Sequence, residues 1–166
     1  MIGLVVLIDL NAKQETVIIN DPDKLKGFYE SHKETIWAGY NSRHYDQFIL
    51  KGILCGFNPK KVNDWIILDD KPGYRFSSLF RNFPLINYDV MPNPPISLKA
   101  LEAFMGHSIK ETTVPFDIDR PLTEAELAET VKYCRHDVEE NCGSMGSQYC
   151  GIQHHNVLCK SLSSWK

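Results

Sequence analysis

The sequence has no apolar run long enough to span a membrane, and its first ten residues lack the basic flank and cleavage site of a signal peptide. It also has little cysteine. Five cysteines in no recognisable disulfide framework predict reduced thiols and a cytoplasmic protein. Internal repeats and low-complexity tracts are missing too. These absences argue against repeat, fibrous and disulfide-stapled classes, and no membrane partner is expected.

The sequence has no excess of positive charge, and its 166 residues carry a net charge of −3. This balance argues against a protein that coats nucleic acid non-specifically, although carboxylates can still hold metal ions that meet phosphate. The charge is uneven along the chain. Six basic and three acidic residues lie from Lys51 to Arg81, whereas the segment from Glu102 to Glu140 is mostly acidic. The length predicts one domain with a full hydrophobic core.

The order of apolar runs and capping residues predicts an α/β domain with three layers, a mixed sheet and helices on both faces, opened by a β-hairpin. The expected strands are Leu4–Leu10, Thr16–Ile19, Thr35–Tyr40 and Leu85–Val90. The expected helices are Asp21–His32, Tyr45–Gly56, Asn58–Trp65, Leu98–Met105 and Thr123–Cys142.

Asp46 lies at an expected strand-to-helix junction, in the run NSRHYDQFIL. A carboxylate at a helix N-terminus is favoured by the helix dipole alone. The end of a central strand is also where open α/β sheets present functional side chains, including metal ligands. Both interpretations stay open, and Asn41, Arg43 and Tyr45 beside Asp46 are candidate contacts for nucleic acid or another partner.

The longest expected helix carries Tyr133 and Asp137 one turn apart, so the phenol and the carboxylate share one face. The carboxylate could bind a divalent cation, and the hydroxyl could hold a water beside it. The alternative is a half-buried tyrosine packed on the helix beside a solvated carboxylate. The pattern is common and does not separate these interpretations.

Aromatic and basic residues are interleaved from Lys51 to Arg81. Such mixing suits stacking on single-stranded bases with phosphate contacts, or anchoring of an acidic partner. A loop whose aromatic side chains complete the core is the alternative. The candidate contact residues are Lys60, Lys61, Trp65, Tyr74, Arg75 and Arg81.

The tail from Gly143 to Lys166 has no acidic residue and no clear periodicity, so it is expected to be weakly structured. Cysteine and histidine side chains in and beside it could ligate zinc, but their spacing matches no standard zinc site. These residues are Cys142, Cys150, His154, His155 and Cys159.

Taken in order, GYNSRHYDQFIL, SLKALE and YCRHD resemble motifs of the DEDD-type 3′→5′ exonucleases of the tyrosine subclass, found in proofreading domains of phage-type DNA polymerases. The resemblance covers about Leu4 to Asn141. It implies a ribonuclease H-like fold, with Asp46 and Asp137 as catalytic ligands of Mg²⁺ or Mn²⁺. It also implies that Asn41 accompanies Asp46 and that Tyr133 orients the attacking water.

The family's first motif, an Asp-x-Glu that supplies two of four metal-binding carboxylates, is missing before Asp46. The sequence most similar to this motif is Asp9-Leu10-Asn11, which lies where a hairpin turn is expected. The simplest interpretation is a chain that begins one strand late and is truncated at both ends, with an exonuclease-like domain over 1–142 and a tail over 143–166. Asp46 and Asp137 alone would leave two metal ions underligated, so feeble or absent hydrolysis is expected.

Two functions remain open. The first is a 3′→5′ exonuclease-like domain that acts on or binds single-stranded DNA, with impaired catalysis. The second is a non-catalytic protein on a truncated exonuclease scaffold that binds a partner, for instance a phage-borne inhibitor of a host nuclease system. Either protein is expected in the cytoplasm of a bacterial cell, encoded by a phage or prophage.

Overall fold

The computed structural model describes residues 2–104, 106, 114, 120–145 and 157–165. Its strands are β1 (Ile2–Asp9), β2 (Gln14–Ile19), β3 (Ile36–Gly39), β4 (Asn87–Asp89) and β5 (Val157–Trp165). Its helices are α1 (Pro22–Ser31), α2 (Asp46–Leu54), α3 (Pro59–Ile67), α4 (Leu79–Asn82), α5 (Leu98–Phe104) and α6 (Glu124–Met145), with a 3-10 turn, η1 (Gly73–Arg75). None of these helices is long and apolar enough to cross a membrane.

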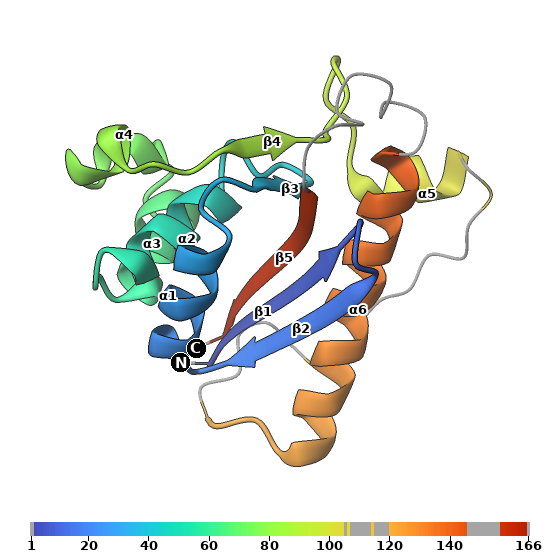
Figure 1. The fold of residues 1–166 in the computed structure, drawn as a ribbon, viewed down its shortest axis with the longest axis horizontal. Coiled ribbons are helices and arrows are strands. Elements are labelled where there is room, and N and C mark those ends of the chain that lie inside the picture. The colour runs from blue at the N-terminus through green and yellow to red at the C-terminus, as the bar shows by residue number, and fades with distance from the viewer. Residues whose placement is uncertain (1, 105, 107–113, 115–119, 146–156, 166) are drawn as a thin grey trace.

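The strands form one mixed sheet in the order β2-β1-β5-β3-β4. β1 pairs antiparallel with β2 and β5, whereas β3 runs parallel to both β5 and β4. Figure 1 shows α1 and α2 on one face of this sheet and α6 on the other. The predicted α/β class, the opening hairpin and the helices on both faces are therefore confirmed.

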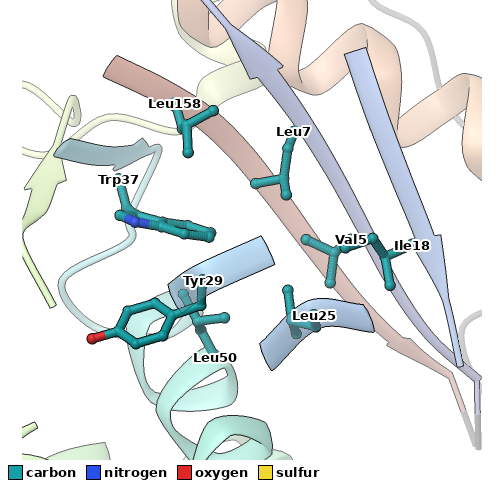
Figure 2. Close-up of a cluster of buried hydrophobic side chains, with 8 residues drawn as sticks. All are labelled: Val5, Leu7, Ile18, Leu25, Tyr29, Trp37, Leu50 and Leu158. Atoms are coloured by element: carbon teal, nitrogen blue, oxygen red, sulfur yellow. The ribbon is translucent and has the colours of Figure 1, made fainter. Parts of the chain in front are cut away.

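β1 is a continuous apolar run because both of its faces are buried. Val5 and Leu7 point toward α1 and α2 and pack in one cluster with Leu25 and Trp37 (Figure 2). Val6 points to the opposite face, as alternation along a strand requires, and packs in a second cluster with the apolar stripe of α6. The two clusters hold the helices against the sheet from both sides.

Local capping sets the helix starts, as the sequence predicts. Asp21 accepts a hydrogen bond of 2.8 Å from the Lys24 backbone N–H, and Pro22 begins α1. Before α6, the Glu126 N–H donates to Thr123 Oγ1 at 3.3 Å, and the Thr123 N–H donates to Glu126 Oε2 at 2.8 Å. These reciprocal bonds fix where α6 begins and therefore which of its residues face the sheet.

The prediction of a separate, weakly structured tail was wrong for the residues that the structure describes. Residues 143–145 belong to α6, and β5 lies between β1 and β3 in the sheet. The physical reason is long-range pairing, because β5 pairs with β1 along Ile2–Asp9 and with β3 along Ile36–Ala38. Local periodicity does not reveal such partners. Residues 146–156, with Cys150, His154 and His155 of the zinc prediction, lie outside the described residues.

Candidate functional site

The connection from β3 to α2 carries Asp46 to the end of the sheet. β3 ends at Gly39, and Asn41 then adopts a left-handed conformation with φ of 52°, which asparagine tolerates better than most residues. The Asn41 carbonyl oxygen accepts a hydrogen bond of 3.1 Å from the His44 N–H and closes the turn. α2 begins at Asp46, which is buried. The predicted strand-to-helix junction is therefore confirmed.

Gly39 leaves the space that the Asp46 carboxylate fills. A Cβ atom at position 39 would lie 3.2 Å from Asp46 Oδ2 and 3.2 Å from the carbonyl oxygen of Lys160. A side chain there would push against both the carboxylate and the backbone of β5. The absence of a side chain at Gly39 thus allows α2 to present Asp46 directly over the sheet.

Lys160 of β5 is fully buried on the same side of the sheet. Figure 2 shows Leu158, two residues earlier on β5, pointing toward α1 and α2, and alternation directs Lys160 to that face as well. The Lys160 ammonium donates a hydrogen bond of 2.8 Å to Asn87 Oδ1, which also accepts one from Ser42 Oγ. Its positive charge is thus held in place by β4 and by the connection that leads into α2.

Burial raises the pKa of Asp46 and lowers the pKa of Lys160, because each charge loses its hydration. The two groups oppose this effect in each other: Lys160 lowers the pKa of Asp46, and Asp46, followed by Asp89, raises the pKa of Lys160. Asp89 and Asp137 raise the pKa of Asp46 further through like-charge repulsion. The structure therefore brings Asp46 and Asp137 within electrostatic range of each other.

The Asp89 carboxylate ties β4 to the β3–α2 connection. Its Oδ2 accepts a hydrogen bond of 2.8 Å from the Arg43 N–H, and its Oδ1 accepts one of 3.0 Å from the Met91 N–H. Arg43 therefore contributes to this connection through its backbone N–H, and the residue itself is exposed to solvent. With two N–H donors, the Asp89 carboxylate is stabilised locally.

On α6, the Tyr133 hydroxyl donates a hydrogen bond to the Asp137 carboxylate, as their spacing of one turn predicts. Burial and the nearby charge of Glu102 raise the pKa of Asp137 to about 7, against the opposing effects of Lys99 and Tyr133. Burial, followed by the charge of Asp137, raises the pKa of Tyr133 to about 12. Glu102 is 3% exposed, and its Oε2 has no hydrogen-bond partner among the described residues. Asp137 thus lies in a poorly hydrated, acidic place.

The two-metal centre that the resemblance implies needs several oxygen ligands around each ion. Within the described part of the chain, no three Asp, Glu, His or Cys side chains are grouped so as to hold a metal ion. The buried ammonium of Lys160 instead brings positive charge to Asp46 and Asp89. A divalent ion at Asp46 would be repelled by that ammonium, so the described residues around Asp46 do not fit a two-metal centre.

A second candidate site lies where α3, η1 and α4 meet. An open pocket of about 670 Å³ is lined there by Trp65, Lys71, Tyr74, Arg75, Ser78 and Arg81. Three of these six residues are basic and none is acidic. Lys71 Nζ lies 4.3 Å from the centroid of the Trp65 ring, and the Arg75 guanidinium lies 5.8 Å from that of Tyr74. The structure thus brings together four predicted contact residues: Trp65, Tyr74, Arg75 and Arg81.

The aromatic side chains of this segment divide into exposed and buried ones. Tyr74 is 44% exposed at the pocket. Phe76 and Phe80 stack with ring centroids 5.7 Å apart, and Phe80 is fully buried. The phenylalanines therefore complete the core, as the alternative predicts, and they support the turn that exposes Tyr74.

The remaining predicted contact residues lie outside the lining of this pocket. Lys60 forms an ion pair of 2.6 Å with Asp64, and the Tyr45 hydroxyl donates a hydrogen bond of 2.7 Å to Asn63 Oδ1. Both side chains thus have structural partners on α3. The exposed residues among the other predicted contacts are Asn41, Arg43 and Lys61.

Sequence reasoning missed Lys160, Asn87 and Glu102. Lys160 is one polar residue in the stretch VLCKSL, and a lysine there is as typical of an edge strand as of a buried one. Asn87 belongs to a three-residue strand with no clear alternation. The apolar residues beside Lys160 were the one sequence signal for a buried strand, because a solvent-facing tail does not need apolar residues.

Comparison of the chain with models of protein families, with curated proteins and with solved structures finds no match.

Proposed function

We propose that this chain binds single-stranded DNA on an exonuclease-like scaffold and does not cut it efficiently. The ribonuclease H-like fold and the relation to DEDD exonucleases belong to this proposal. Support comes from the order of the elements: a hairpin, a strand-to-helix junction with Asp46, and a late helix with hydrogen-bonded Tyr133 and Asp137. The mixed sheet with helices on both faces is compatible with that fold.

The observation that carries the binding function is the composition of the basic aromatic pocket. Its cations Arg75 and Arg81 can meet backbone phosphates, whereas Lys71 is paired with Asp69 at 2.8 Å. The rings of Trp65 and Tyr74 offer flat apolar area for bases. Because the cations lie beside the rings, phosphate and base contacts would be adjacent, as they are along a single strand. The net charge of −3 confines such affinity to this surface.

The impaired chemistry has a separate basis at the Asp46 site. Hydrolysis by two ions needs carboxylates that are free to bind them, and catalytic groups that act as a unit fail together. Asp46 is buried within electrostatic range of the Lys160 ammonium, and Asp137 has a pKa raised to about 7, which weakens it as a metal ligand at neutral pH. The scaffold is therefore better suited to holding a strand than to cutting it.

Replacing Arg75 and Arg81 together by alanine should weaken binding of single-stranded DNA by about tenfold at low salt. Loss of two phosphate contacts should also reduce the slope of log affinity against log salt concentration by about 1.4. Fluorescence anisotropy of a labelled oligonucleotide, titrated with protein at several salt concentrations, measures both quantities.

The matched control is Lys24→Ala with Lys26→Ala, which removes the same charge from exposed positions on α1. This control should change the affinity by much less than the arginine pair. Circular dichroism should show both double variants folded. Equal affinities of wild type and the Arg75/Arg81 variant across the salt series would remove the pocket from the binding function and favour a protein partner.

A further inference from the structure

The site around Lys160 contains a buried cation and, in Asp46, a buried carboxylate that the proposed DNA binding does not use. A fully buried ammonium is costly unless opposite charges and hydrogen-bond acceptors surround it. Lys160 is 0% exposed and has one such acceptor, Asn87 Oδ1, at 2.8 Å. The carboxylates within electrostatic range of it are Asp46, which has the larger effect, and Asp89.

Asp46 needs a positive charge for the same reason. Its carboxylate lies over Gly39, in a space that also borders the backbone of Lys160. Asp46 is also the carboxylate with the larger effect on the pKa of Lys160, ahead of Asp89. Figure 1 shows β5, which carries Lys160, in the centre of the sheet beside β3. The cation is therefore part of the core and not a side chain on its rim.

We propose that Lys160 is the built-in cation of this site, supplying covalently the positive charge that a divalent ion would otherwise bring to Asp46. Asp46 and Lys160 then act as an internal charge pair that joins the start of α2 to the central strand. The site is complete without a metal ion, and Asp46 is a structural partner of Lys160. This inference is independent of nucleic-acid binding.

Four proteins test the inference: wild type, Asp46→Asn, Lys160→Met and the double variant, compared by thermal unfolding in chelator and in millimolar Mn²⁺. Either single change leaves one buried charge without its partner, so each should lower the unfolding midpoint by about 10 °C. The double variant should unfold no more than a few degrees below the less stable single variant. Wild type and Asp46→Asn should respond equally to Mn²⁺.

Lys51→Met is the matched control, because Lys51 is another buried lysine on the same side, and its ammonium donates to the Phe80 carbonyl oxygen at 3.0 Å. Its effect should add to that of Asp46→Asn. Additive losses for Asp46 and Lys160 would overturn the proposal, and so would Mn²⁺ stabilisation of wild type that Asp46→Asn removes. Should a single variant fail to fold, a folded double variant supports the pair, and an unfolded one overturns it.

Discussion

Replacing Gly73 by alanine is expected to lower the free energy of unfolding by about 3 kcal/mol and to weaken binding of single-stranded DNA. A Cβ atom at this position would overlap the ring of Phe48. That ring cannot easily move, because Phe48 is buried and stacks on Phe80 with centroids 6.0 Å apart. The backbone of η1 must shift instead, and η1 carries Tyr74 and Arg75 of the basic aromatic pocket.

Urea unfolding measures the stability effect, and oligonucleotide anisotropy measures the effect on the pocket. Gly27→Ala is the matched control, because a Cβ atom there meets nothing within 4 Å. Gly27 lies inside α1, where alanine is the better helix former, so this control should gain up to about 1 kcal/mol. A Gly73→Ala protein as stable as wild type would mean that Phe48 and η1 are not packed as described.

Asp137→Asn is expected to stabilise the protein above neutral pH by on the order of 2 kcal/mol. Burial and Glu102 raise the pKa of Asp137 from 3.8 to about 7, so the folded protein keeps this proton while the unfolded chain loses it. The contribution of Asp137 to stability is therefore fully present at low pH and is lost as the pH rises through about 7. Asparagine does not ionise in this pH range, so the free energy of unfolding of the variant should not fall in the same way as the pH rises.

The measurement is the free energy of unfolding of wild type and Asp137→Asn from about pH 4 to about pH 8. The two curves should nearly coincide at the acid end and separate as the pH rises toward 7. Glu30→Gln is the control, since Glu30 is 68% exposed and its neutralisation should change little at any pH. A constant difference between the Asp137→Asn and wild-type curves would contradict the burial of this carboxylate.

The elements that the sequence predicts well are those whose cause is local. Asp21 with Pro22 and Thr123 with Glu126 cap helices within a few residues of themselves, and the structure shows those caps. The hairpin follows from two β-rich runs and the turn between them. The Tyr133–Asp137 contact follows from helical spacing alone. Each of these features can be judged from a window of a few residues.

β5 and its lysine could not be predicted in this way, because their partners are distant in sequence. Lys160 depends on Asn87, Asp46 and Asp89, which come from two other segments of the chain. A lysine in an apolar stretch gives no sign of such partners until the sheet has formed. The Tyr133–Asp137 part of the candidate site therefore depends on local helical spacing. The part around Lys160 depends on the topology of the sheet.

Whether the chain holds single-stranded DNA without cutting it can be measured by following the anisotropy of a 5′-labelled single-stranded oligonucleotide over time, in Mg²⁺ or Mn²⁺. Binding raises the anisotropy, and cutting lowers it below the value of the free strand. We predict a rise on mixing that persists and that Arg75→Ala with Arg81→Ala diminishes. The absence of a rise would contradict binding. A decline that chelator stops and Asp137→Ala abolishes would show an active nuclease.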